Sequence, residues 1–218
     1  MYNQGFVYYE TVLAKDVHYV TLIVRDFAVV ALNGNFLTSL DRSVSIKHNL
    51  TLNCSTGPCT LSILVEAMGH INFDHQMETD KKGLFFFNDT RATKFEWDIY
   101  KININEDITK WRMNTGSLYF PTLFRGSFSV SEVGDTFINV SKYKKGYVWV
   151  NGNNLGRYWN KGPTSKLFCP GVWLKSGQNE IYILELLTDV SSELTGDKTL
   201  KGWSMTNYLN KLILFISK

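Results

Sequence analysis

An Asn-Gly pair between two apolar runs is the feature that most constrains how this chain folds. The apolar run at residues 147–150 breaks at Asn151-Gly152 and resumes at Leu155. Both central residues of a tight hairpin turn need a positive φ, which asparagine and glycine adopt more readily than other residues. The sequence therefore predicts a two-residue β-hairpin here, and with it a fold built from antiparallel strands.

The register of this hairpin decides which side chains face the core. A two-residue turn predicts the pairs Val150–Asn153, Val148–Leu155 and Tyr147–Gly156. Successive side chains of a strand point to opposite faces of the sheet. The side chains expected on the core face are Val148, Val150 and Leu155. Those expected on the other face are Tyr147, Trp149 and Tyr158, with Gly156 leaving room for an aromatic ring.

The same pattern occurs earlier in the chain. Residues 30–37 match residues 148–155 at Val, Asn, Gly, Asn and Leu. Each copy is followed about 30 residues later by an Ile-Leu pair in a strand-like run, at 63–64 and at 183–184. Two copies of one jelly-roll plan are the simplest explanation of this internal repeat.

Longer strings resemble a known family. The second half of the chain contains VWVNGNNLGRYWNKGP and LFCPGVWLKSGQNEIYILEL, and the first half contains GFVYYET, VRDFAVVALNG and LVEAMGHINFDHQMETDKKGL. They resemble the C-terminal β-domains of eukaryotic glycoside hydrolase family 35 β-galactosidases, over about residues 5–187. The resemblance implies an all-β fold of two jelly-roll β-sandwich (galactose-binding-like) domains. We expect a first, partial jelly roll at 1–90, a second with its linker at 91–187, and a tail at 188–218.

The resemblance does not extend to the catalytic domain of that family, a (β/α)8 barrel that precedes the β-domains. Such a barrel needs roughly 250 residues, and the whole chain has 218. A retaining glycosidase also needs two carboxyl groups about 5 Å apart, and nothing in the spacing pairs Glu66 with Glu185. We therefore expect no catalytic residues, no enzyme activity and no cofactor.

The aromatic residues of the hairpin are candidates for sugar binding. A sugar site needs an exposed aromatic ring beside polar groups that pair with hydroxyls. The candidate stacking rings are Tyr147, Trp149, Tyr158 and Trp159, and the candidate hydroxyl partners are Asn153, Asn154 and Arg157. The alternative is that these rings fill sheet interiors, as aromatics do in β-sandwiches, and that the NLGRYW motif serves the fold, as it does in the resembling enzymes.

The cysteines and sequons bear on the compartment. Cys54 and Cys59 flank a Ser-Thr-Gly-Pro turn; they form a disulfide in an oxidising compartment and stay free thiols in a reducing one. Four Asn-X-Ser/Thr sequons occur, at Asn49, Asn53, Asn88 and Asn139, and chance produces some in a chain rich in these residues. No secretory signal is visible, which favours an intracellular or organellar location, mitochondria included, over a secretory one.

One loop has the ligand types of a metal site. Residues 69–83 collect His70, Asp74, His75, Glu78 and Asp80, which by chemistry alone would suit a metal ion. In the resembling enzymes the same segment is a loop after the last strand of the first jelly roll. We expect a solvated loop with local Asx turns and no metal.

The C-terminal tail leaves two alternatives open. After a polar stretch at 188–201 it carries an apolar pattern that ends near Lys218. The tail is either the last strand of a sheet or an exposed anchor that docks on a partner. The candidate docking residues are Trp203, Tyr208, Leu212, Leu214 and Phe215.

Three functions follow from these observations. We favour a non-catalytic structural or accessory subunit of a larger protein assembly, with an organelle as one setting and other protein subunits as partners. The second hypothesis is a lectin-like module that binds a galactoside or other glycan, and the third is the non-catalytic part of a split β-galactosidase. A net charge of +3 is too small to argue for nucleic acid, so we expect no nucleic-acid partner. No apolar run is long enough to form a transmembrane segment.

Overall fold

The computed structural model describes residues 4–73, 75–89, 95–104, 108, 113–114, 121–187, 195–197 and 204–214. The chain forms two compact units, Met1–Glu106 and Asp107–Lys218. The described residues contain strands and short 3-10 helices, among them η1 (His75–Glu78) and η3 (Gly171–Trp173), and no α-helix. The all-β class expected from the sequence is confirmed.

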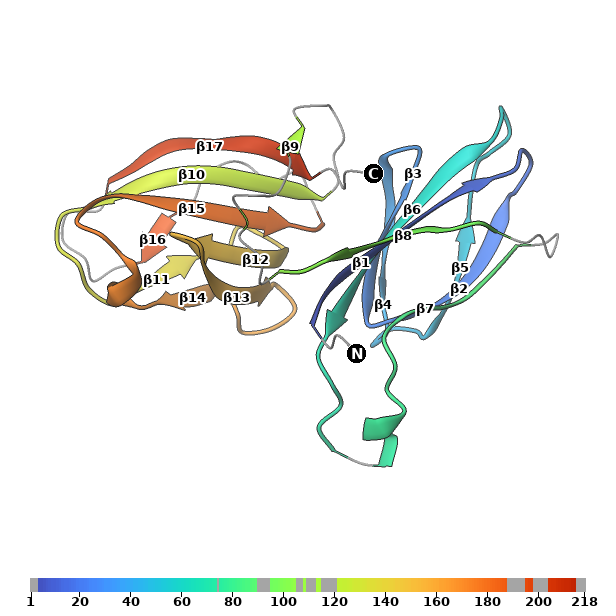
Figure 1. Ribbon diagram of the computed structural model, residues 1–218, viewed down its shortest axis with the longest axis horizontal. Helices are drawn as coiled ribbons and strands as arrows, with labels where there is room; N and C mark the ends of the chain where they lie inside the picture. Colours follow the sequence, from blue (N-terminus) through green and yellow to red (C-terminus); the bar gives the residue numbers. More distant parts are fainter. Residues whose placement is uncertain are drawn as a thin grey trace. The chain divides into compact units, whose positions relative to one another are not determined.

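Unit 1 consists of two antiparallel sheets (Figure 1). The larger has the order β4-β3-β6-β1-β8 and the smaller the order β5-β2-β7. The strands are β1 (Gln4–Leu13), β2 (Tyr19–Arg25), β3 (Phe27–Leu32), β4 (Asn35–Asp41), β5 (Lys47–Thr51), β6 (Cys59–Met68), β7 (Gly83–Asp89) and β8 (Asp98–Ile102). β8 pairs with β1, so the sheet of unit 1 extends beyond residue 90, the boundary expected from the sequence.

Unit 2 is built in the same way (Figure 1). Its larger sheet has the order β13-β12-β15-β10-β17-β9 and its smaller sheet the order β14-β11-β16. The strands are β9 (Met113–Asn114), β10 (Thr122–Val130), β11 (Thr136–Asn139), β12 (Lys145–Val150), β13 (Asn153–Trp159), β14 (Lys166–Cys169), β15 (Gly177–Glu185), β16 (Thr195–Asp197) and β17 (Ser204–Leu214).

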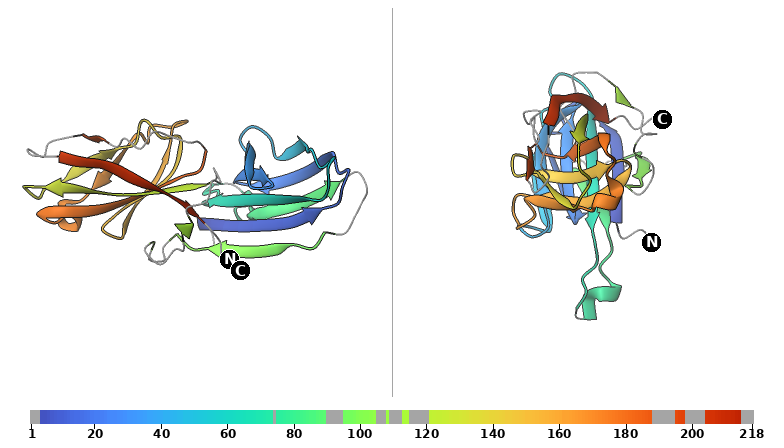
Figure 2. Two further views of the ribbon diagram at one scale, coloured as in Figure 1. Left: turned by 90° about the horizontal axis from the view of Figure 1, so that it is seen from above. Right: turned by 90° about the vertical axis from the view of Figure 1, so that its left-hand side faces the viewer.

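The strand orders show that the internal repeat is structural. β4-β3-β6-β1-β8 of unit 1 corresponds position by position to β13-β12-β15-β10-β17 of unit 2, and β5-β2-β7 corresponds to β14-β11-β16. β17 therefore takes the place of β8, and β9 is an addition beyond it. Figure 2 shows the two layers of strands within each unit.

Each unit has its own core between its sheets. In β2, Val20, Leu22 and Val24 are buried while the alternate residues are more exposed, the period-two pattern of a strand with one face in a core. These three valine and leucine side chains belong to the core cluster of unit 1. The core of unit 2 contains Val148 and Val150 of β12, packed with residues of β10, β11 and β15. Burial of such apolar surface is the main driving force for each unit.

Both Asn-Gly turns have the predicted backbone geometry. φ is 51° at Asn33 and 78° at Gly34, and 49° at Asn151 and 82° at Gly152. Positive φ at both central residues gives the twist that a two-residue hairpin needs. The first predicted pair of the second hairpin, Val150–Asn153, is also present.

The rest of the predicted register is wrong, because each hairpin contains a β-bulge. Val148 lies opposite Gly156 instead of Leu155, and Tyr147 lies opposite Arg157 instead of Gly156. The extra residue, Leu155, shifts all later partners by one. A shift of one residue moves every following side chain to the other face of the sheet. The first hairpin has the same irregularity between Val30 and Ala31.

The segment between β6 and β7 forms an arm that extends away from the sheets of unit 1 (Figures 1 and 2). It carries η1 and two exposed apolar side chains, Phe73 at 82% and Met77 at 47%.

No helix among the described residues has the length and apolar character needed to cross a membrane.

Candidate carbohydrate-binding hairpin and its surroundings

Three of the four candidate stacking rings are buried. Tyr147 and Trp149 lie on the same side of β12, with ring centroids 6.0 Å apart, and are 6% and 1% exposed. Tyr158 is 1% exposed and belongs to the core cluster of unit 2. Stacking on a sugar needs an exposed ring face, which these three rings do not offer in this conformation.

The bulge explains why Tyr158 is separated from Tyr147 and Trp149. Tyr158 lies opposite Gly146 and therefore shares the core face with Val148 and Val150. Gly146 is necessary at this point, because a Cβ there would lie 1.6 Å from the carbonyl oxygen of Leu184 and 2.7 Å from the Tyr158 hydroxyl. The expectation that Tyr158 shares a face with Trp149 is therefore wrong.

The Tyr158 hydroxyl is part of a buried polar cluster around Glu185. It lies 2.9 Å from the Leu184 carbonyl oxygen and 3.1 Å from Glu185 Oε2. The Glu185 carboxylate also accepts hydrogen bonds from the backbone N–H groups of Lys144, Lys145 and Leu187. Burial raises the pKa of Glu185, and these donors oppose the increase. The cluster ties the end of β15 to the start of β12, which is a structural role.

Trp159 is the one candidate ring of the hairpin that is partly exposed. Two ammonium groups lie over its face, Lys145 Nζ at 4.5 Å and Lys161 Nζ at 5.5 Å from the ring centroid. Such cation–π contacts stabilise the ring by about 0.5–2 kcal/mol each. Because Lys145 is fully buried, the lysine side chain and the indole ring form part of the packing at the end of the hairpin.

Two of the three candidate hydroxyl partners, Asn153 and Asn154, make hydrogen bonds within the hairpin itself. Asn153 Nδ2 donates to the carbonyl oxygens of Val150 (3.3 Å) and Asn151 (3.4 Å). Asn154 Oδ1 accepts a 2.8 Å hydrogen bond from the N–H of Gly156, which holds the backbone at the bulge. Arg157 is half-buried. Asn153 and Asn154 lie next to the turn, whereas Arg157 lies opposite Tyr147, further along the hairpin.

The side chain of Asn151 makes three hydrogen bonds that tie the turn to β15 and to η3. Its Oδ1 accepts from the N–H of Glu180 (3.0 Å), and its Nδ2 donates to the Trp173 carbonyl oxygen (2.7 Å) and to Asn179 Oδ1 (2.8 Å). Asn33 in unit 1 makes the equivalent bond, with its Oδ1 2.8 Å from the Thr60 nitrogen. The repeated Asn-Gly pair was the signal for this shared role.

The candidate docking tail is a strand of the unit 2 sheet as far as it is described. β17 pairs with β10, where Leu212 lies opposite Leu123, and with β9, where Leu214 lies opposite Met113. Tyr208 falls where the register with β10 shifts. Trp203 and Phe215 lie outside the described residues. Docking by these five residues stays a prediction.

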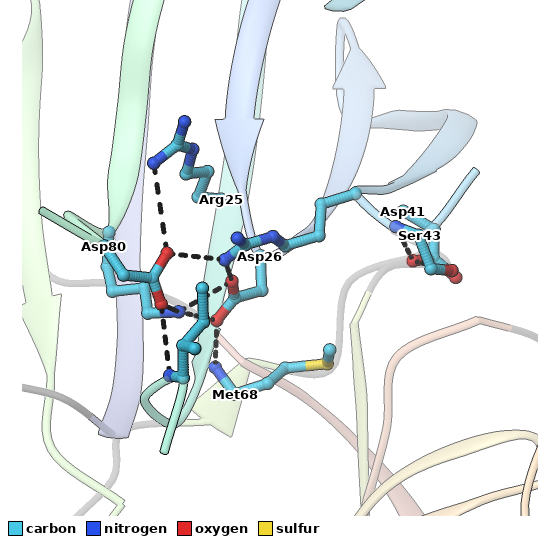
Figure 3. A network of polar contacts seen from close by, with 9 residues as sticks. Arg25, Asp26, Asp41, Ser43, Met68 and Asp80 are labelled. Atoms are coloured by element: carbon cyan, nitrogen blue, oxygen red, sulfur yellow. Dashed lines mark hydrogen bonds and ion pairs between the residues drawn. The ribbon is translucent and has the colours of Figure 1, made fainter. Parts of the chain in front are cut away.

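A buried charge cluster at the base of the arm was not predicted (Figure 3). Asp26 and Asp80 are 3% and 4% exposed. Lys82 Nζ lies 2.8 Å from Asp26 and 2.7 Å from Asp80, and Arg42 contacts both carboxylates. Arg25 Nη1 is 3.9 Å from Asp80.

The charge cluster fixes the arm to the sheets of unit 1. Asp26 Oδ2 also accepts from the N–H of Met68 at the end of β6, at 2.8 Å. Burial alone would raise the pKa of Asp80, but hydrogen bonds from Lys82 and Arg42 outweigh it and lower the pKa to about 2. The Asp80 carboxylate is therefore charged at neutral pH, and both aspartates are paired with cations, as buried charges must be.

The described part of the arm does not hold a metal site. No group of three or more His, Cys, Asp or Glu side chains with metal-binding geometry occurs among the described residues. Asp80 belongs to the charge cluster, and Asp74 lies outside the described residues.

Cys54 and Cys59 are joined in a disulfide, with Cα atoms 5.5 Å apart.

Two family models match the chain. The model of the β-galactosidase first all-beta domain matches residues 1–103, and the model of the β-galactosidase galactose-binding domain matches residues 121–179. Among curated proteins, the human "Beta-galactosidase-1-like protein 2" is 31% identical over 191 residues, which are 83% of this chain and 29% of that protein. The "Beta-galactosidase" of Felis catus is 33% identical, over 84% of this chain and 31% of that protein.

The chain spans less than a third of the length of these relatives.

Among solved structures, a GH78 family rhamnosidase of Bacillus sp. GL1 is 10% identical with a TM-score of 0.33, over 93% of this chain and 32% of that chain. The apo form of a Pleurotus ostreatus lectin is 10% identical with a TM-score of 0.28, over 95% and 79%. TM-scores this low establish no shared fold.

Proposed function

The chain belongs to the β-galactosidase family, in which it represents β-domains and no catalytic barrel is matched, and from this we propose that it acts as a non-catalytic structural or accessory subunit of a larger protein assembly. Its partners would be other protein subunits. Its contribution would be two folded β-domains that present their surfaces to those subunits, with no chemistry of their own.

The use of the hairpin side chains is the observation that carries this proposal. Tyr147, Trp149 and Tyr158 are buried, and the amides of Asn153 and Asn154 are hydrogen-bonded within the turn. A sugar would have to displace these contacts to reach the rings and amides, at a cost of roughly 1 kcal/mol for each hydrogen bond lost. The hairpin therefore supports a structural role better than a lectin-like one.

Isolation of the native protein tests the proposal. We expect it to elute from a sizing column well above the 25.0 kDa of the chain, together with stoichiometric protein subunits, and to pass through a galactose column without retention. A monomer of chain size in the native extract would refute the proposal. Retention on the column with elution by free galactose would favour the lectin-like function instead.

A second candidate is the non-catalytic part of a split β-galactosidase. It is favoured by the two family models, which both describe β-galactosidase domains, and by the small share of each relative that the chain covers. This candidate requires that the co-purifying subunit be a (β/α)8 barrel and that the complex hydrolyse a galactoside. If the co-purifying proteins are unrelated to glycosidases, this candidate fails and the accessory role in another assembly stands.

A further inference from the structure

Two sequons lie on and beside an exposed edge strand of unit 1. Asn49 is within β5, and Asn53 lies two residues after the end of β5. Along residues 49–53 the burial alternates, with Leu50 and Leu52 buried at 8% and 3% and the residues between them exposed. Because side chains alternate along an extended chain, both asparagines point to solvent.

The hydroxyl residue of each sequon is exposed as well. Thr51 completes the first sequon and Ser55 the second, and both are exposed. An Asn-X-Ser/Thr sequence is an acceptor only if the asparagine and the hydroxyl residue can be reached. Both sequons therefore meet this requirement on the surface of the folded unit.

The hydrogen bonds of these asparagines leave the reactive atom unused. Thr21 Oγ1 donates to Asn49 Oδ1 at 2.8 Å, and Ser55 Oγ donates to Asn53 Oδ1 at 2.7 Å. In both cases the acceptor is Oδ1, whereas an N-linked glycan is attached to Nδ2. A glycan could thus be present in the folded protein without loss of either hydrogen bond.

The disulfide next to Asn53 is an independent indication of the compartment. Cys54 is the middle residue of the second sequon and is bonded to Cys59. Structural disulfides form in the oxidising secretory route and are rare in the cytosol, and N-glycosylation takes place in the same route. This differs from the intracellular location expected from the sequence.

Asn139 offers a contrast within the same chain. It lies in β11, the central strand of the order β14-β11-β16, and its side chain is half-buried. A bulky glycan is accommodated less well between two flanking strands than at an edge. The side chain of Asn88 is outside the described part of the chain.

We propose that Asn49 and Asn53 are N-glycosylation sites. In the reaction, Nδ2 of the asparagine forms a bond to C1 of a polyprenyl-diphosphate-linked oligosaccharide. The bond from C1 to the diphosphate oxygen breaks, the lipid diphosphate leaves with the electron pair, and the amide loses one proton. The co-substrate is the lipid-linked sugar, and no oxidant or reductant is needed.

Glycans at these two positions cover a surface that would otherwise be open to association. β5 is the edge strand of the β5-β2-β7 sheet, and unpaired edges favour intermolecular strand pairing. Three exposed apolar side chains lie near β5. Tyr19 is opposite Thr51 and is 56% exposed, and Val44 and Ile46, which precede β5 in the sequence, are 77% and 46% exposed. The glycosylated sheet is then excluded as a protein interface.

The test is site mapping on the full-length protein isolated from its natural source. Treatment with peptide N-glycosidase in heavy-oxygen water converts each glycosylated asparagine to labelled aspartate, which peptide mass spectrometry locates. We expect label at Asn49 and at Asn53 and a loss of mass of the intact protein. No loss of mass, or label at Asn139 with none at Asn49 and Asn53, overturns the proposal.

Variants expressed in cells of the natural source separate the two sites. Asn49→Gln and Thr51→Ala each remove the glycan at Asn49, and Asn53→Gln and Ser55→Ala each remove the one at Asn53, seen as one step in gel mobility. Thr51→Ser is the matched control, because it keeps a hydroxyl at the third position and so keeps the glycan. If Thr51→Ala leaves the mobility unchanged, Asn49 is not an acceptor.

Discussion

The two Asn-Gly turns provide a quantitative prediction, because equivalent asparagines make different numbers of hydrogen bonds. In Asn151→Ala three side-chain hydrogen bonds are lost, at about 1 kcal/mol each. In Asn33→Ala one is lost. In both, alanine must adopt the left-handed φ of 49° or 51°, which costs about 1 kcal/mol relative to asparagine. We expect Asn151→Ala to destabilise unit 2 by about 4 kcal/mol and Asn33→Ala to destabilise unit 1 by about 2 kcal/mol.

Hydrogen exchange followed by mass spectrometry is the appropriate assay, because peptides report on each unit separately. The free energy of opening is measured for core peptides of β15 in the Asn151 variant and of β6 in the Asn33 variant. Asn151→Gly separates the two contributions, since glycine accepts a positive φ without strain but restores no hydrogen bond, and we expect a loss of about 3 kcal/mol. The reasoning is refuted if Asn151→Ala costs no more than Asn33→Ala.

Three further changes follow from the buried polar groups. The pKa of Asp80 is about 2 in the folded protein, against 3.8 for an ordinary aspartate side chain. Its contribution to stability of about 2 kcal/mol is therefore present above pH 4 and disappears as the pH falls toward 2. Asp80→Asn should remove this acid dependence from urea unfolding curves. Tyr158→Phe leaves Glu185 with one donor fewer and should cost about 1–2 kcal/mol in the exchange assay on unit 2, with no change in unit 1. Cys59→Ser opens the short loop closed with Cys54 and should lower the stability of unit 1 by about 2 kcal/mol; a thermal midpoint equal to that of the reduced wild type confirms that the loss is due to the disulfide.

Local sequence signals predicted the turns correctly. They did not predict the strand register beyond the point where the chain departs from regular pairing. Asn151-Gly152 has the positive φ values that the residues require. The bulge at Leu155 has no comparable signature, because leucine also fits a regular strand. Its consequence was large, since one extra residue placed Tyr158 in the core instead of beside Trp149. The face of each side chain therefore could not be predicted beyond the bulge.

The charge cluster could not be predicted for a different reason. Asp26, Arg42 and Asp80 are far apart in the sequence and meet only because β3, β4 and the arm converge. Charged residues in a loop normally indicate a solvated segment, which was the expectation for Asp80. The burial of Trp149, a candidate ring for sugar stacking, could not be predicted either. A strand residue on the outer face of a sheet is exposed or covered according to tertiary packing, which the local sequence does not determine.

The position of β17 has a consequence for the order in which unit 2 is completed during synthesis. β10 is the first long strand of the unit to leave the ribosome, and β17 is the last. β15 pairs with one side of β10, while the other side, over residues 122–129, waits for β17. Until residues 204–214 emerge, the nascent unit has an open strand edge in the middle of its future sheet. During this interval the open edge can pair with other extended segments, and a stop codon before β17 would leave it permanently open to aggregation.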